Sequence, residues 1–363
     1  MKKLRLHSVP NSLLTICILT NGARKQRLQR VLSFIEFLGF RCIILDSAST
    51  SLDLEYNRCS LYIHCPDETT IHRLLKIPNL VESKYLLLSP DDDFFLPLGI
   101  QRCLQFLEEN DQYTSAQGQR IYFREGKVIE WGPMYENYTG LDFWEDDVRE
   151  RLLRMSCSMH FIYSVMRTEV FSKIISTLEN TESKNPNSAF QVEYVFNYLL
   201  ALFGKHKILP ILYSARERHP VWHQNLSFSG WINDTQDQAA VNFRRSISRM
   251  YQSSMKLSDL DAQKLEQEIT NYFVRRPKAK TIENLSLGRF KNLAKRFIRT
   301  FSKGFESGVL LRWRFSKLRP FFPLWRKSYW RYYFEIWKSG NVVNFYKDLS
   351  SFIQFLQRNK VSD

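Results

Sequence analysis

A short apolar segment that stops at three carboxylates is the feature that most constrains this chain. The segment KYLLLSP at residues 84–90 runs directly into Asp91, Asp92 and Asp93. An apolar run of this length predicts a strand buried on both faces, as in parallel sheets. Pro90 cannot donate to a ladder, so pairing is expected to end there. The carboxylates therefore follow the carboxyl end of a core strand, the edge at which open α/β sheets bind ligands.

Three adjacent carboxylates repel one another, and the neighbouring sequence offers them no cation on that side of the strand. A divalent cation would solve this problem, because Mg²⁺ and Mn²⁺ prefer carboxylate oxygens and are often shared with substrate phosphates. Asp91 and Asp93 are expected to face one crevice while Asp92 faces away. The alternative is a solvated acidic turn before the next helix, and the apolar residues on both sides of the motif count against it.

Strands and helices alternate along the first half of the chain. Periodicity and turn residues predict strands at 13–20, 41–46 and 60–64, and helices at 27–37, 67–81 and 98–108. Gly39 is the expected stop of the first helix. Asp67 is the expected cap of the second, and Pro78 a break within it. This alternation predicts a mainly parallel sheet with right-handed crossovers.

The second half of the chain contains fewer alternating elements. Strands are predicted at 113–118, 120–123, 157–167 and 207–213, and helices at 148–155, 187–204, 241–251 and 259–273. From about residue 242 the alternation stops. We therefore divide the chain into an α/β domain at 1–240 and a helical, basic, aromatic-rich region at 241–363.

Positive charge is concentrated in the C-terminal region. The net charge is +15, and residues 272–338 hold 18 Lys or Arg against three acids, which gives 18 − 3 = +15. Within it, residues 290–301 alternate apolar and basic side chains with helical spacing. Such a helix is typical of an anionic membrane surface, here contacted through residues 289–338. A plain solvated face and single-stranded nucleic acid are the alternatives, with nucleic acid the least favoured.

Cysteine use and hydropathy indicate the compartment. The six cysteines form no CxxC pair, which indicates buried free thiols in a reducing environment. No signal peptide is visible, and no window holds 18 or more apolar residues. We expect a cytoplasmic protein, peripheral on the inner face of the membrane.

The strand that ends in Asp91-Asp92-Asp93-Phe94 resembles the DxD region of GT-A fold glycosyltransferases, in a bacterial subgroup related to the family-2 enzymes. The resemblance covers about residues 13–220. It implies a Rossmann-like nucleotide-diphospho-sugar transferase fold, an α/β mixed sheet flanked by helices, with the helical basic extension outside it. It also implies metal-assisted transfer of a sugar, with inversion, from a nucleotide-sugar to a hydroxyl of a saccharide or lipid-linked acceptor, as in polysaccharide biosynthesis.

The same resemblance implies roles for individual residues. The donor-binding residues would be Thr20, Asn21, Arg24, Asp46, Asp91, Asp92 and Arg216. The Mn²⁺ or Mg²⁺ ligands would be Asp91, Asp93 and His219, with His223 as a competitor for the last position.

Glu193, near the start of the helix at 187–204, would be the general base that deprotonates the acceptor hydroxyl. The family often carries two acids here, whereas this chain has Gln191-Val192-Glu193. Each assignment has a plainer alternative. Asn21 is equally a turn residue, Asp46 a strand-end cap, and Glu193 an acid that complements the helix dipole.

Two other classes of function stay open at this point. A nucleotidyltransferase also uses an acidic strand end and a metal, but it usually has a glycine-rich loop after its first strand. Residues 21–24, Asn-Gly-Ala-Arg, contain one glycine. A non-catalytic protein that binds membrane or nucleic acid on a transferase-like fold would show no metal dependence of nucleotide binding.

Overall fold

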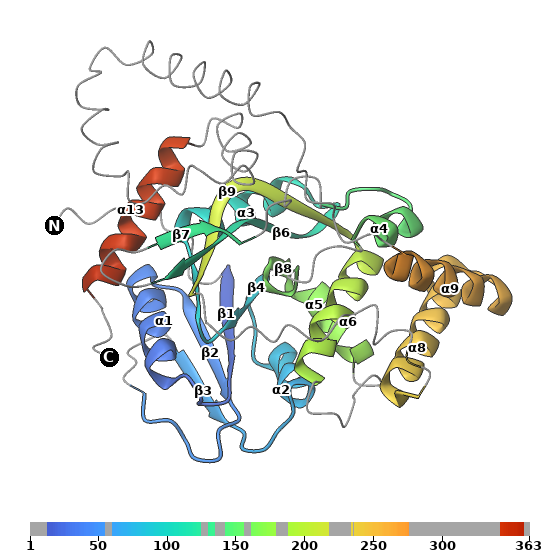
Figure 1. The fold of residues 1–363 in the computed structure, drawn as a ribbon, viewed down its shortest axis with the longest axis horizontal. Coiled ribbons are helices and arrows are strands. Elements are labelled where there is room, and N and C mark those ends of the chain that lie inside the picture. The colour runs from blue at the N-terminus through green and yellow to red at the C-terminus, as the bar shows by residue number, and fades with distance from the viewer. Residues whose placement is uncertain are drawn as a thin grey trace, which may run out of the picture.

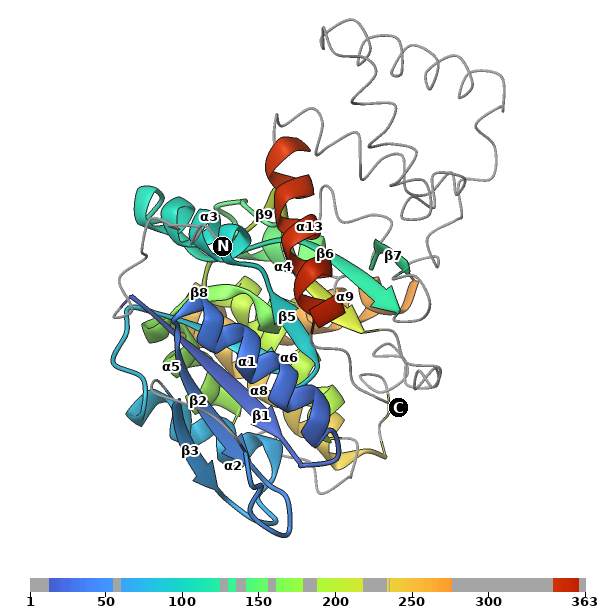
Figure 2. The ribbon, with the colours of Figure 1, turned by 90° about the vertical axis from the view of Figure 1, so that its left-hand side faces the viewer.

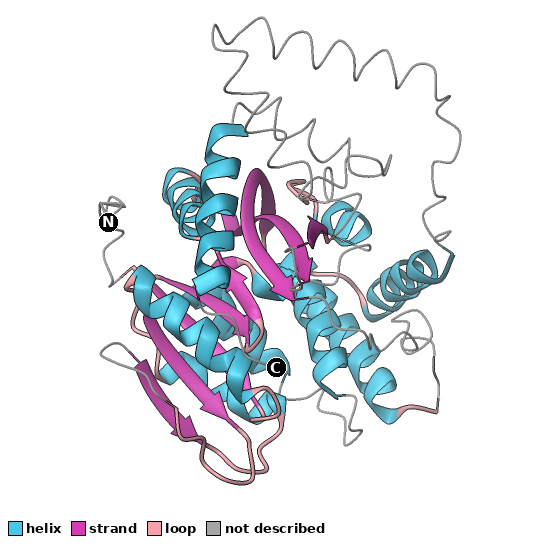
Figure 3. Ribbon diagram, turned by 60° about the vertical axis from the view of Figure 1, so that its left-hand side comes forward, coloured by secondary structure: helices cyan, strands magenta, loops and turns pink. Residues whose placement is uncertain are grey.

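The computed structural model describes residues 13–54, 60–124, 130–134, 142–155, 161–178, 188–217, 234, 236–275 and 342–358. In these residues, helices cover both faces of one mixed sheet, so the predicted α/β class is confirmed (Figures 1 and 3). The strand order is β3-β2-β1-β4-β8-β6-β9-β5, and β7 pairs with β6.

The parallel half of the sheet consists of four strands that the sequence predicted. They are β1 (Leu14–Thr20), β2 (Arg41–Asp46), β3 (Ser60–His64) and β4 (Tyr85–Pro90). All three pairings among them are parallel. The register places Thr20 opposite Asp46 and Leu19 opposite Pro90. The carboxyl ends of β1, β2 and β4 therefore meet at one edge.

The other half of the sheet differs more from the sequence prediction. Its strands are β5 (Asp93–Phe95), β6 (Tyr113–Arg124), β7 (Glu130–Pro133), β8 (Val165–Arg167) and β9 (Lys205–Glu217). The two strands predicted at 113–118 and 120–123 form one strand. Its pairing with β9 contains register shifts, two of which lie between Gln117 and Arg120. Of the strand predicted at 157–167, the described part is strand only at Val165–Arg167, after the 3₁₀ turn Phe161–Tyr163.

The helices are α1 (Lys25–Leu38), α2 (Thr70–Lys76), α3 (Pro97–Glu109), α4 (Val148–Met155), α5 (Thr168–Leu178), α6 (Ser188–Phe203), α8 (Gln238–Met255), α9 (Asp259–Arg275) and α13 (Val342–Arg358). Gly39 ends α1 with φ 73°, as predicted. The predicted cap Asp67 is wrong. It has φ 60°, whereas an N-cap is extended, and Thr69 caps α2 by accepting from the His72 amide. Pro78 lies in the 3₁₀ turn Ile77–Asn79 after α2, where a break was predicted.

Two apolar cores lie on the two faces of the sheet. One is shared by α2, α4, α5, α6, α8 and α9, and the other by α1, α3 and α13. Figure 2 shows α1 and α13 on the same side of the strands. The Phe352 ring of α13 lies 5.2 Å from that of Phe94 and 5.3 Å from that of Phe123, between ring centroids. The helix nearest the C-terminus therefore packs on the strand that begins at Asp93.

The predicted division near residue 240 stays a prediction, and the described helices beyond it pack into the two cores of the sheet. Among the described residues, no helix is long and apolar enough to cross a membrane. Cys17, Cys42, Cys65 and Cys103 are buried free thiols, as predicted. The basic helix predicted at 290–301 and the proposed membrane contact at 289–338 lie outside the described residues.

Asp348 on α13 gives the fold a testable pH dependence. Removal from water raises the pKa of this carboxyl group to about 7. A raised pKa means that the fold favours the protonated form of Asp348. The contribution of this side chain to the free energy of unfolding is therefore fully present below about pH 4 and is lost as pH rises towards 7. We expect Asp348→Asn to stabilise the protein by about 1–3 kcal/mol at pH 8 and to change nothing at pH 4.

Thermal unfolding of both proteins at the two pH values would measure this effect. Glu36→Gln, at an exposed acid on α1, is the matched control and should behave like wild type at both. An Asp348→Asn variant with an unchanged melting temperature at pH 8 would contradict the prediction.

Candidate functional site

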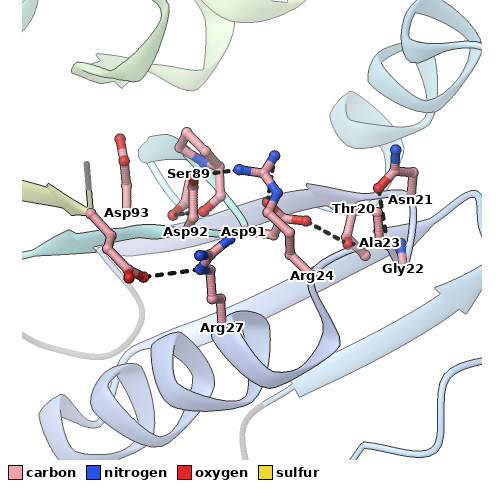
Figure 4. A network of polar contacts seen from close by, with 12 residues as sticks. Thr20, Asn21, Gly22, Ala23, Arg24, Arg27, Ser89, Asp91, Asp92 and Asp93 are labelled. Carbon is pink, nitrogen blue, oxygen red and sulfur yellow. Dashed lines mark hydrogen bonds and ion pairs between the residues drawn. The ribbon is translucent and has the colours of Figure 1, made fainter. Parts of the chain in front are cut away.

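The predicted donor residues converge where the parallel strands end. Thr20 is the last residue of β1, Asp46 the last of β2, and Asp91 directly follows β4. The Thr20 hydroxyl donates to Asp91 Oδ2 at 2.8 Å, across 71 residues of sequence. Figure 4 shows this contact and the charged side chains around it. The carboxyl edge of the sheet is therefore where the chain gathers these polar groups.

Arg24 joins the first two carboxylates of the motif. It precedes α1, and its Nη2 lies 3.1 Å from Asp91 Oδ1 while its Nη1 forms an ion pair with Asp92 (Figure 4). Both acids are buried, whereas the Arg24 side chain is 39% exposed. Burial raises the pKa of Asp91, and the positive charge of Arg24 and the Thr20 hydrogen bond oppose that rise. Arg24 is thus the partly exposed partner of two buried acids.

Asp93 has different partners. It pairs in register with Arg216 because β5 runs antiparallel to β9, and Arg216 Nε donates to Asp93 Oδ1 at 2.7 Å. Its other oxygen forms an ion pair with Arg120 of β6, in which both side chains are fully buried. Arg120 Nε also donates to Ser214 Oγ at 2.8 Å. The prediction that Asp91 and Asp93 face one crevice while Asp92 faces away is wrong. The chain begins a new strand at Asp93, and this strand gives Asp93 partners that Asp91 does not share.

Asp46 and Asn21 make local contacts that fit their plainer interpretations. Asp46 accepts from the Ala48 amide at 2.8 Å and from the Tyr62 hydroxyl, and Asn21 accepts from the Ala23 amide at 3.2 Å. Their contacts with a donor stay predictions.

Sequence reasoning missed Arg73, a residue of α2 that contacts the same edge of the sheet. This buried guanidinium on α2 donates to the carbonyl oxygens of Thr20 at 2.6 Å and Leu45 at 3.2 Å. It therefore ties together the carboxyl ends of β1 and β2. Nothing in its local sequence distinguishes Arg73 from an ordinary helix-surface arginine.

Glu193 lies close to the Asp93 network. It is half-buried on α6 and accepts a hydrogen bond from the Tyr163 hydroxyl. Burial raises the pKa of Glu193, and the Tyr163 hydrogen bond and the charges of Arg216 and Arg120 oppose that rise. The guanidinium carbon of Arg120 lies 5.3 Å from the centroid of the Tyr163 ring. The candidate base is thus linked through Tyr163 and Arg120 to the end of the acidic motif.

The described residues do not fit a divalent cation held jointly by Asp91 and Asp93. The two carboxylates face different partners, and both oxygens of Asp93 are bound by guanidinium groups. Within the described part of the chain, no group of three or more His, Cys, Asp or Glu is arranged to hold a metal ion. His219 and His223, the other predicted ligands, lie outside that part.

Comparisons with known proteins give similarity to solved structures at low sequence identity. No protein-family model matches it, and no curated protein is significantly similar in sequence. Among solved structures, S. aureus TarS 1-349 is 10% identical with a TM-score of 0.44, covering 77% of each chain. The same TarS fragment in complex with UDP-GlcNAc is 10% identical with a TM-score of 0.42, covering 77% of each chain. At this distance, function has to be argued from the chain's own side chains.

Proposed function

We propose that this protein is a glycosyltransferase that moves a sugar from a nucleotide-sugar donor to a hydroxyl group of a saccharide or lipid-linked acceptor. One observation carries the proposal. Next to the polar edge formed by Thr20, Asp91 and Asp92, Asp93 pairs with Arg120, which packs on the Tyr163 ring. The Tyr163 hydroxyl in turn donates to Glu193, a half-buried carboxylate with a raised pKa. A donor-binding edge and a base thus lie in one network, as a transfer to a hydroxyl requires.

The donor half of the site would recognise the diphosphate by charge. Arg24 and Arg216 are partly exposed, at 39% and 21% of their side-chain surfaces. A guanidinium group binds phosphate oxygens bidentately, so these two side chains are suited to orient the leaving group. Thr20, Asn21 and Asp46 lie at or next to the ends of the adjoining strands, where the nucleobase and the ribose of the donor would lie.

The acceptor half of the site would use Glu193. Its carboxylate takes the proton of the acceptor hydroxyl as that oxygen forms a bond to the anomeric carbon. The bond from the anomeric carbon to the diphosphate oxygen breaks at the same time, and the nucleoside diphosphate leaves with the electron pair. Attack opposite to the leaving group inverts the anomeric centre. A carboxylate with a raised pKa is a stronger base than an ordinary one, which suits it to this step.

The membrane partner remains part of this proposal. The basic residues 289–338 lie between α9 and α13 in sequence, and both helices pack into the cores of the sheet. Their charge would suit an anionic membrane surface that presents a lipid-linked acceptor, on the cytoplasmic side.

Nucleotide binding tests the proposed donor site. We expect one of UDP, GDP and CDP to bind the wild type in calorimetry, and Arg24→Gln to weaken that binding by about 10–100-fold. The variant loses a charged donor and leaves Asp91 and Asp92 to repel the diphosphate. Arg102→Gln, at an exposed arginine on α3, is the control and should bind like wild type. A folded wild type that binds none of the three nucleotides would overturn the proposal.

A further inference from the structure

The acidic motif is neutralised by side chains distant in sequence. Arg24 precedes α1, Arg120 lies on β6 and Arg216 on β9, and each forms an ion pair with a carboxylate of the motif. Three carboxylates and three guanidinium groups give −3 + 3 = 0. The reason for expecting a divalent cation was a cluster of unneutralised carboxylates, and the fold removes that reason.

Asp93 is the least available of the three as a metal ligand. Its side chain is fully buried, with one oxygen on Arg120 and the other on Arg216. A cation at Asp93 would enter a fully buried site beside two guanidinium groups, and it would either be repelled by their charge or displace one of them from its partner. Leaving a buried charge without its partner is strongly unfavourable. Asp93 is therefore better explained as the residue that orients two arginines.

Arg24 has the arrangement of a bridging cation. One of its terminal nitrogens contacts Asp91 and the other contacts Asp92, so a single positive group spans both carboxylates (Figure 4). It approaches them from the partly exposed side, where a diphosphate would arrive. A guanidinium group has five N–H donors, so it can hold carboxylates and still donate to phosphate oxygens.

From these contacts we propose that Arg24 and Arg216 take the place of the divalent cation, so that the donor's nucleoside diphosphate binds without metal. Arg24 would bridge the acids and the diphosphate. Arg216, whose Nε is engaged by Asp93, would offer its Nη groups. This inference rests on the proposed function and specifies how that site recognises the diphosphate.

Calorimetry with and without metal tests the inference. The wild type is titrated with UDP, GDP and CDP, once in EDTA and once in Mn²⁺. We expect the nucleotide that binds to do so with dissociation constants within about threefold in the two conditions. Binding that requires Mn²⁺ would overturn the inference while leaving the proposed function intact. Absence of binding in both conditions would overturn the proposed function and this inference with it.

Arg24→Gln provides the second arm, because it exposes Asp91 and Asp92 without their bridging charge. In EDTA this variant should bind the nucleotide at least tenfold more weakly than wild type. Mn²⁺ should recover at least part of that loss, because the cation can now occupy the position that the guanidinium group held. A loss that Mn²⁺ does not reduce at all would show that Arg24 does not stand in the place of a cation. Arg102→Gln, in the same buffers, should follow the wild type.

Discussion

Replacing Glu193 with glutamine is expected to lower the rate of sugar transfer by about 10²–10⁴-fold. Glutamine has nearly the same shape, and its amide oxygen still accepts the hydrogen bond from Tyr163. It cannot take a proton from the acceptor hydroxyl. Nucleotide affinity should therefore stay within about threefold of wild type. The rate is measured as nucleotide release from a panel of nucleotide-sugars, with water or an added saccharide as acceptor, and the affinity by calorimetry.

The pH dependence of the same reaction separates a base from a structural residue. Transfer needs the Glu193 carboxylate, so the rate should rise with pH through a pKa that burial has raised. Tyr163→Phe removes a hydrogen bond that stabilises the charged form, and should move this rise to higher pH. Glu169→Gln, at an exposed acid on α5, is the control. A Glu193→Gln enzyme with the wild-type rate would exclude Glu193 as the base.

Replacing Asp93 with asparagine is expected to lower the free energy of unfolding by about 3–5 kcal/mol. The change removes the charge that both oxygens of Asp93 present to Arg120 and Arg216, and the buried Arg120 is left without a carboxylate at that position. Chemical denaturation in EDTA measures the effect. The experiment needs no substrate.

The control for Asp93 is an acid that also contacts an arginine but at the surface. Asp111 is 91% exposed and lies 3.5 Å from Arg167, so Asp111→Asn should change stability by less than about 1 kcal/mol. If the role of Asp93 were instead to bind a metal, Asp93→Asn would leave the metal-free protein as stable as wild type or more so, because like charges would be removed. An unchanged unfolding energy in EDTA would therefore contradict the structural role.

The elements predicted best were those whose signals are local. The strands β1, β2, β3 and β4 are short apolar runs that end at Thr20, Asp46, His64 and Pro90, and short apolar runs bounded by polar or turn residues are typical of buried strands. Helix α1 carries an apolar stripe and a glycine that adopts φ 73°, both readable from the sequence. Because parallel strands end at a common edge, the meeting of Thr20 and Asp91 followed from these elements alone.

The elements predicted least well depend on packing between distant segments. Helix α13 was not predicted as a separate element, and its Phe352 packs on Phe94, 352 − 94 = 258 residues away in sequence. Strand β5 has three residues, too few for a pattern, and it is a strand because β9 offers it an edge. That pairing directs Asp93 towards Arg216, whereas Asp91 and Asp92 share Arg24. The sequence had predicted that Asp91 and Asp93 would face the same crevice.

The sequence by itself determined the alternating α/β class, the position of the acidic motif at a strand end and the candidate residues around it. Each of these follows from neighbours within one strand or one helical turn, where periodicity and turn chemistry act. Only the tertiary structure decided which cations neutralise the carboxylates, because Arg24 is 68 residues from Asp92 and Arg216 is 123 from Asp93. Ion pairs over such separations form only when the fold brings distant segments of the chain together.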